Sequence, residues 1–319
     1  MLAERLSADG RSRVLVLEVG GENRSPWVEM PKGVARLVSN PRHILTYQVS
    51  QPRFPGNEAN EIWVRGKGLG GCSAVNGMIW ARGEPADFDA WEADGCTGWN
   101  GETMTAAFNA LEDHELGDDP MRGHGGRVRI APKIFSYPLA DRMVEAGVQM
   151  GLKPVEDLNA ATGDRIGFYS HNVRRGRRES AARTFLAPAR KRQNVTIKTG
   201  VTVERILFAN GKAIGVETRT GSQAKMYGCR GEVIVCAGSL ESPLLLQRSG
   251  IGNAEHLKSV GITPLVDSPD VGERMLEHLG FAMPHRLNAR VGTNTAFYGI
   301  GLVGSMIRYL LTRGGIMAT

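Results

Sequence analysis

The sequence predicts an α/β protein of one large or two ordinary domains. Three observations support this class. Apolar segments of strand length alternate along the chain with segments of helical periodicity. The 41 glycines among 319 residues fall between the apolar runs, as the tight loops of an α/β fold require. Two short apolar segments end in Glu18 and in Gly238, where an α/β sheet presents a cofactor site at its carboxyl edge.

The first ten residues are typical of the end of a helix, because Leu2 and Leu6 share a face and Asp9-Gly10 stops it. A buried strand with Glu18 at its carboxyl end follows. In a dinucleotide-binding βαβ unit, an acid in this position accepts hydrogen bonds from ribose hydroxyls. That unit also needs a strand and a glycine turn before its first helix. Met1 already lies in the helix, so we expect the first strand and its phosphate loop to be missing.

Residues 26–55 are rich in proline, arginine and polar side chains, which predicts a loop. A strand is expected at 61–65. Helices are expected at 102–115 and 138–151, where apolar residues recur every three or four positions. In the second helix Pro138 fits an early position. One face of it is lined by Leu139, Met143, Ala146 and Met150.

Strands dominate the following part of the chain. Apolar residues alternate over 194–200, and Asn210-Gly211 predicts a hairpin between two further strands. Residues 231–238 predict a short apolar strand that ends in glycine. After it, Ser242 is expected to cap a helix with Pro243 at its first position and Gly250 at its end.

The stretch GKGLGGCSAVNGM, residues 66–78, contains a literal G-x-G-x-x-G. A pyrophosphate-binding turn also requires an acid about 20 residues later, at the end of a buried strand. The nearest acids, Glu84 and Asp87, lie in a polar segment that contains proline. The stretch is therefore not expected to bind pyrophosphate. A glycine loop that lets two elements pack closely is the simpler alternative.

Two long motifs nevertheless resemble the glucose-methanol-choline (GMC) flavoprotein oxidoreductases. GKGLGGCSAVNGMIWARG is similar to the first signature of that family, and GSLESPLLLQRSGIG, residues 238–252, is similar to the second. Weaker similarities keep the family's order at 87–100, 157–189 and 271–279. In the last of these, residues 274–277 depart from the family's usual Asn-Leu-Gln-Asp. The resemblance covers nearly the whole chain, and choline-dehydrogenase-like members are nearest.

This resemblance implies a Rossmann-like FAD-binding domain, with its first βα unit incomplete, over residues 1–98 and 185–280. A partial α+β substrate-binding domain, residues 99–184 and 281–319, would be interleaved with it. Glu18 would hold the adenosine ribose, and the backbone of Val203 would contact the adenine. The implied FAD-contacting residues are Glu18, Gly68, Gly70, Gly71, Asn76, Gly77, Met78, Ile79, Val203, Ala237 and Gly238.

Within this set, the glycines would let backbone approach the flavin, because a Cβ would hold a flat ring away. Residues 76–79 would lie along the isoalloxazine ring and the ribityl chain, with Asn76 as an uncharged donor and acceptor. Ala237 and Gly238 would line the sheet edge. Taken singly, Glu18 has the alternative of a solvated strand-end acid, Val203 of a core residue and Asn76 of a helix cap.

The implied reaction is oxidation of the CH-OH group of a primary alcohol, choline-like or aliphatic. A hydride would pass to flavin N5 while a base takes the hydroxyl proton. Some members bind FAD covalently through a histidine, and Val75 at the matching position predicts non-covalent FAD. The family's catalytic histidine lies near its carboxyl end and has no match here, so the catalytic residue is unknown. His278 matches a histidine of a cofactor loop, and His285 is expected at a surface.

The electron acceptor is left open between oxygen and a respiratory carrier. The alternative function is a non-catalytic fragment or remnant of such an enzyme. A nicotinamide-dependent dehydrogenase is a weaker alternative, because it depends on Glu18 alone.

Composition excludes several other classes. The net charge of +6 is modest, and the dense basic run at 174–178 lacks interleaved aromatics, which predicts a solvated loop and no nucleic-acid partner. No run is apolar and long enough for a membrane span, and no signal peptide opens the chain. The four cysteines have neither metal-ligand nor disulfide-framework spacing and fit a reducing cytosol. We expect a cytoplasmic protein without a metal, with peripheral membrane association left open.

Overall fold

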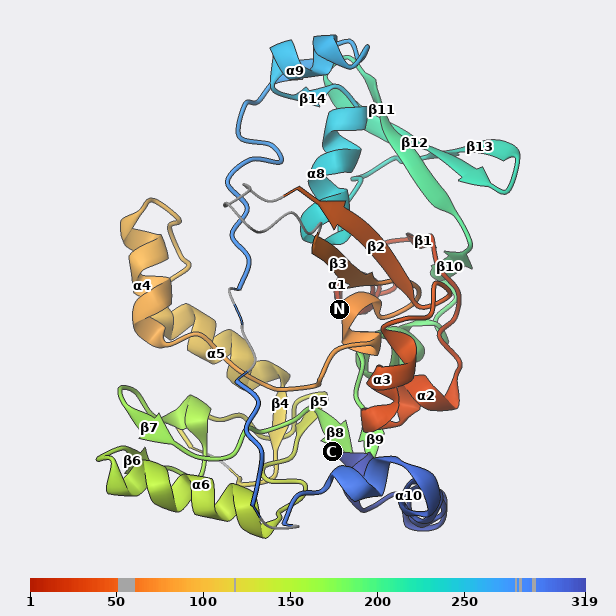
Figure 1. The fold of residues 1–319 in the computed structure, drawn as a ribbon. Helices are drawn as coiled ribbons and strands as arrows, with labels where there is room; N and C mark the ends of the chain where they lie inside the picture. Colours follow the sequence, from red (N-terminus) through yellow and green to blue (C-terminus); the bar gives the residue numbers. More distant parts are fainter. Residues whose placement is uncertain (51–60, 118, 279, 281–282, 289–290) are drawn as a thin grey trace. The chain divides into compact units, whose positions relative to one another are not determined.

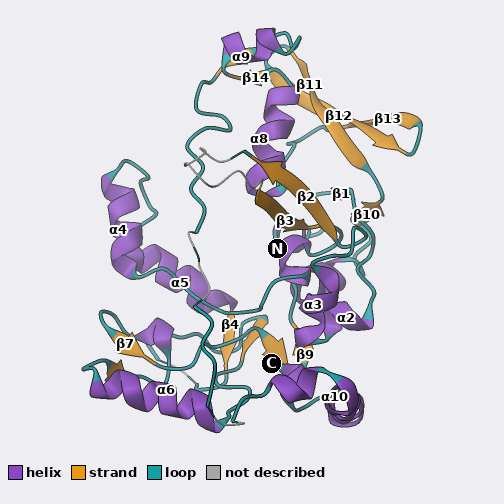
Figure 2. Cartoon of the chain, in the orientation of Figure 1, coloured by secondary structure: helices purple, strands orange, loops and turns teal. Residues whose placement is uncertain are grey.

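The computed structural model describes residues 1–50, 61–117, 119–278, 280, 283–288 and 291–319 (Figure 1). The chain forms two compact units. Unit 1 comprises Met1–Val14, Gly21–Thr196 and Arg286–Thr319, and unit 2 comprises Leu15–Gly20 and Ile197–His285. The chain contains both helices and strands, which is consistent with an α/β class (Figure 2). The strand β1 (Val14–Glu18) pairs with β10 (Val195–Thr199), and both were expected from the sequence.

Unit 2 is centred on a three-stranded antiparallel sheet of β11 (Thr202–Ala209), β12 (Lys212–Thr220) and β13 (Gln223–Gly228). The predicted hairpin is confirmed: Ala209 pairs with Lys212 across Asn210 and Gly211, which have φ of 50° and 73°. Asparagine and glycine are the residues that tolerate positive φ at both positions of such a turn.

The helix α8 (Gly238–Arg248) packs on this sheet, where Leu245 joins Ile206 and Val216 in one hydrophobic cluster. The backbone N–H of Ile206 also donates to Ser249 Oγ at 2.8 Å. The unit is completed by α9 (Ala254–Ser259) and by the parallel pair β14 (Ile251–Gly252) and β15 (Val266–Asp267).

The predicted strand at 231–238 is wrong. Residues 232–236 keep the alternation of a strand, since Val233 and Val235 pack on the cluster of unit 2 while Ile234 is exposed. Among the described residues, however, no strand pairs with this segment. A strand requires a hydrogen-bonded neighbour as well as an alternating pattern, and that neighbour is a long-range feature.

The predicted start of the next helix is also wrong. The helix α8 begins at Gly238 with Ala237 as its N-cap residue, so Pro243 lies inside the helix. Ser242 does not cap at the predicted position, because its Oγ accepts from the N–H of Ala237 at 3.1 Å. The predicted end is confirmed: Gly250, at a φ of 88°, follows the C-cap residue Ser249.

Unit 1 holds most of the remaining elements. Its helices are α1 (Leu2–Leu6), α2 (Pro26–Glu29), α3 (Val34–Leu37), α4 (Pro85–Ala93), α5 (Gly101–Leu111), α6 (Pro138–Gln149), α7 (Ala187–Ala189) and α10 (Gly299–Thr312). Short 3-10 or π turns are η1 (Pro31–Gly33), η2 (Gly71–Ala74), η3 (Leu158–Ala160), η4 (Ala182–Leu186), η5 (Asn294–Phe297) and η6 (Ile316–Ala318). Its strands pair as β2 (Ile44–Val49) with β3 (Glu61–Gly66), β4 (Glu112–His114) with β5 (Val128–Ile130), β6 (Lys153–Pro154) with β7 (Arg165–Ile166), and β8 (Val173–Arg174) with β9 (Arg177–Arg178).

The predicted loop at residues 26–55 is wrong over residues 26–50, which form α2, α3 and β2. Residues 51–55 lie outside the described residues. The helix α2 starts because Ser25 Oγ accepts from the N–H of Trp27 at 3.3 Å and proline occupies the first turn. Helices of four residues are too short for periodicity to show. The helices α5 and α6 are confirmed, although Glu112–His114 leave the predicted helix to pair with β5.

One hydrophobic cluster of unit 1 anchors the segment 66–79 through two of its buried side chains. Ala74 and Val75 are buried against Val28 of α2 and Leu37 of α3. Because these apolar contacts come from the segment that follows Glu22, the loop after β3 is tied to the loop after β1.

Candidate functional site

Residues 66–79 form a loop after β3 in which several glycines adopt left-handed backbone. Gly68 has a φ of 102°, and a Cβ on it would lie 2.7 Å from both Gly21 O and Asn23 Nδ2. On Gly66 a Cβ would lie 2.3 Å from Gly71 O. Close packing within the chain therefore requires glycine at these two positions. This agrees with the simpler alternative, a glycine loop that lets two elements pack closely.

Gly71 and Gly77 differ, because a Cβ on either would meet no atom within 4 Å. Open space beside a glycine leaves its backbone accessible to a ligand. Gly70 is intermediate: its φ is 96° and a Cβ would lie 3.3 Å from that of Ala182. The structure thus divides the predicted glycines into packing positions and positions that fit the approach of a flat ring.

The start of the loop is fixed by Asn23, which the sequence did not indicate. Its Nδ2 donates to Lys67 O at 3.1 Å and to Leu69 O at 3.0 Å, and His43 Nδ1 contacts its Oδ1 at 2.8 Å. Since Asn23 Oδ1 can only accept, His43 donates from Nδ1. Burial, with a smaller contribution from Arg42, lowers the pKa of His43, so the neutral ring is favoured.

The end of the loop is a turn centred on Asn76. Its Oδ1 accepts from the N–H of Met78, two residues on, at 3.1 Å. The helix-cap alternative is wrong, because the next helix is α4, whose N-cap residue is Glu84. Met78 has a φ of 60° and a buried side chain, so only its backbone is available to a ligand, whereas Ile79 is exposed.

Arg178 is a site residue that sequence reasoning missed. The basic run 174–178 was predicted to be solvated, yet the Arg178 side chain is only 2% exposed, and Nη1 donates to Asn76 Oδ1 at 2.8 Å. Nothing in the local pattern distinguishes it from the other arginines of the run. Its burial is set by residues about 100 positions earlier in the chain.

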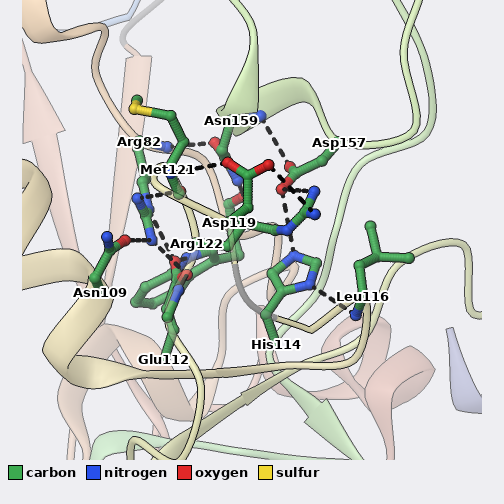
Figure 3. A network of polar contacts seen from close by, with 12 residues as sticks. Arg82, Asn109, Glu112, His114, Leu116, Asp119, Met121, Arg122, Asp157 and Asn159 are labelled. Atoms are coloured by element: carbon green, nitrogen blue, oxygen red, sulfur yellow. Dashed lines mark hydrogen bonds and ion pairs between the residues drawn. The ribbon is translucent and has the colours of Figure 1, made fainter.

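The segment after Ile79 is held by a buried polar network (Figure 3). Arg82 forms an ion pair with Glu112, and these side chains are 3% and 1% exposed. Arg82 Nε donates to Glu112 Oε1 at 2.8 Å, and the indole N–H of Trp80 donates to the same oxygen. Asn159 closes the network from η3, because its Nδ2 donates to Trp80 O at 2.9 Å and its Oδ1 accepts from Arg82 N at 2.9 Å.

His114 lies at the edge of this network, with its Nε2 3.6 Å from Asp157 Oδ2 (Figure 3). The N–H of Leu116 donates to His114 Nδ1 at 3.2 Å, which places the ring proton on Nε2. Burial lowers the pKa of His114, and the charges of Asp157 and Glu112 oppose this effect. We interpret the network as a support for the loop, because Arg82 bonds to both Glu112 and Asn159.

In unit 2, the segments that carry the other predicted residues pack on one hydrophobic cluster. Glu18 O accepts from the N–H of Val201 at 3.0 Å, and Glu18 Oε1 accepts from the N–H of Gly20 at 2.8 Å. Leu17, Val203 and Val235 all pack on the cluster of Ile206, Val216 and Leu245. Leu17, which precedes Glu18, and Val235, two residues before Ala237, therefore share one cluster with Val203. The simpler alternative for Val203, a core residue, agrees with its half-buried side chain, which packs on this cluster.

Gly238 opens α8 at a φ of 90°, and a Cβ there would meet no atom within 4 Å. Like Gly71 and Gly77 in unit 1, it therefore has accessible backbone, which is compatible with a predicted FAD position. Over the described residues, the helices are all too short or too polar to cross a membrane, and His, Cys, Asp and Glu do not gather in a group able to hold a metal. All four cysteines are free.

The sequence model of the GMC oxidoreductase family matches residues 5–280. The chain belongs to this family. An oxygen-dependent choline dehydrogenase of Rhizobium etli is 37% identical to it over 320 residues, which cover 100% of this chain and 58% of that relative. The chain thus spans little more than half the length of the curated relatives it matches. The resemblance read from the two signatures is confirmed.

Solved structures similar to this chain share its fold. Pyridoxine 4-oxidase from Mesorbium loti has a TM-score of 0.78 at 36% identity, covering 84% of this chain and 53% of that one. An FAD-dependent oxidoreductase from Chaetomium thermophilum has a TM-score of 0.86 at 25% identity, covering 99% and 57%. The expected α/β fold class is confirmed, and FAD is the cofactor of this family.

Proposed function

We propose that this chain forms the greater part of the FAD-binding scaffold of an oxidoreductase that acts on the CH-OH group of a primary alcohol. The observation that carries the proposal is the loop 66–79. It lies within the family match and combines open backbone at Gly71 and Gly77 with an Asn76 amide held from below by a buried arginine. Choline and pyridoxine, named in the relatives, are both primary alcohols, which supports this substrate class.

The proposed contacts divide between the two units. In unit 2, Glu18 would accept from the adenosine ribose, the backbone of Val203 would meet the adenine, and Ala237 and Gly238 would flank the cofactor. In unit 1, Gly68, Gly70, Gly71, Asn76, Gly77, Met78 and Ile79 would face the flavin and ribityl part. Met78 would contribute backbone only, since its side chain is buried.

Bound FAD supplies the acceptor for a hydride from the alcohol carbon. The chain's own contribution is to hold the ring: glycine backbone allows close approach, and the Asn76 amide offers an uncharged donor. We propose that the whole protein adds the base that takes the hydroxyl proton. We also propose residues 1–98 and 185–280 as the FAD-binding domain and residues 99–184 and 281–319 as part of the substrate-binding domain.

We propose that FAD binds non-covalently, in the cytoplasm. Val75 occupies the position of the linking histidine of some family members. Its side chain has no nucleophilic atom and is buried in the cluster with Val28 and Leu37. The electron acceptor remains open between oxygen and a respiratory carrier.

The experiment is an absorption scan of the purified chain for bound flavin, followed by dye-linked turnover with a panel of primary alcohols that includes choline. Bound FAD supports the proposed scaffold, and turnover of an alcohol supports the proposed activity. Bound FAD without turnover favours the alternative, a non-catalytic part of such an enzyme. Absence of FAD binding after incubation with excess cofactor contradicts the scaffold proposal.

A further inference from the structure

Arg178 is a buried cation for which the described residues supply no carboxylate partner. The neighbouring Glu179 pairs instead with Arg174 at 3.1 Å and with Arg183 at 3.1 Å. Burial lowers the pKa of Arg178 to about 10, which leaves the guanidinium charged at neutral pH. A buried charge is costly unless polar groups compensate it. The guanidinium of Arg178 therefore requires hydrogen-bond acceptors close to it.

Those groups are backbone and amide oxygens of two segments. Nε donates to Val28 O at 3.0 Å, and Nη1 donates to Asn76 O at 2.6 Å and to Ser73 O at 3.3 Å. The same Nη1 lies 2.8 Å from Asn76 Oδ1. Arg178 therefore binds both the main-chain carbonyl and the side-chain carbonyl of one residue, and this defines the plane of the Asn76 amide.

The turn that follows needs such support. Asn76 Oδ1 also accepts from the N–H of Met78, which has a φ of 60°. A left-handed conformation is unfavourable for a residue with a Cβ and persists only where its surroundings enforce it. With Oδ1 engaged twice, Nδ2 of the exposed Asn76 is the amide atom that remains for a ligand.

The same short segment holds the other end of the loop. Ser73 Oγ donates to Gly70 O at 2.5 Å and accepts from the N–H of Ala181 at 2.9 Å. Ala182 contacts Gly70 so closely that a Cβ on the glycine would lie 3.3 Å away. Contacts with residues 178–182 therefore hold the conformation of the loop from Gly70 to Met78.

We propose that Arg178 is a positioning residue for the cofactor: it acts through Asn76 and holds the turn 76–78 in the conformation that binds the flavin part of FAD. This inference rests on the proposed function for its ligand. The positioning itself is a property of the chain and is testable without the cofactor.

The first test measures hydrogen exchange of the peptide that covers 73–79 in the chain without FAD, for R178K, N76A and the double variant. R178K keeps the positive charge and removes the planar guanidinium, which donates from both Nε and Nη1. We expect exchange at Met78 to rise about tenfold or more in each single variant, and no further in the double variant, since both remove one coupled interaction. The control is R177K, because Arg177 is 36% exposed and contacts Glu29 at 3.6 Å.

Unchanged exchange in R178K, or effects that multiply in the double variant, overturn the proposal. If R178K does not fold, R178M provides the test, because it removes the guanidinium and leaves no buried charge behind. In that case unchanged exchange at Met78 is the outcome that overturns it.

The second test measures FAD affinity of the same variants by quenching of flavin fluorescence. We expect the Kd to rise about tenfold in R178K and in N76A, without a further rise in the double variant, and to stay unchanged in R177K. A wild-type chain that binds no FAD contradicts the proposed function, while the exchange result still decides the positioning. Affinity that falls in N76A but not in R178K overturns the role of Arg178.

Discussion

Replacing Glu112 by alanine should destabilise unit 1 severely, because the change leaves Arg82 buried without its partner (Figure 3). Glu112 accepts from Arg82 Nε at 2.8 Å, from the Trp80 indole, and from the N–H of Gly123 at 3.2 Å. Removing one member of a buried pair costs about 3–5 kcal/mol. We expect the free energy of unfolding, measured by urea denaturation, to fall by about that amount.

A matched control lies in the same network. Asp119 is 36% exposed and contacts Arg122 at 3.7 Å, so Asp119→Asn should change the free energy of unfolding by less than about 1 kcal/mol. The double variant Arg82→Met/Glu112→Leu should recover part of the loss, because two apolar residues leave no uncompensated charge. A loss below about 1 kcal/mol for Glu112→Ala, or a double variant less stable than the single one, would refute this account of the network.

Three further outcomes are expected. Gly68→Ala should lower the free energy of unfolding by about 1–3 kcal/mol because of backbone clash and positive φ, while Gly77→Ala should leave unfolding nearly unchanged and weaken FAD binding; equal unfolding effects would contradict the division between the two glycines. Burial lowers the pKa of His114, so the unfolded chain binds more protons than the folded one. The stabilising contribution of the neutral ring should be fully present above the ordinary pKa of 6.5 and be lost as the pH falls through the lowered pKa. His114→Gln should flatten that loss below the ordinary pKa of 6.5 in pH-dependent unfolding; an unchanged slope would count against it. Acid precipitation should release all yellow colour into the supernatant, since Val75 cannot bond to flavin, and colour in the pellet would rule this out.

Local chemistry was sufficient where a few neighbouring residues decide the conformation. Asn210-Gly211 defines its hairpin because both residues tolerate positive φ, and Pro138 begins α6 because the first helical turn needs no N–H. Which face of α6 is buried was not decided locally. Met143 and Met150 of its apolar face are exposed, and Gly147 instead packs so closely that a Cβ would lie 2.2 Å from Ile166 Cδ1.

The sequence by itself determined the family, the cofactor and the loop that carries the candidate site, because two long motifs keep their order. Only the tertiary structure decided which of that loop's residues are available. Gly68 serves packing against Gly21 and Asn23, whereas Gly77 leaves its backbone open. Arg178 looks like one more solvated arginine, and it is buried under Asn76. The physical reason is that burial and close approach depend on segments far apart in the chain, which no local pattern records.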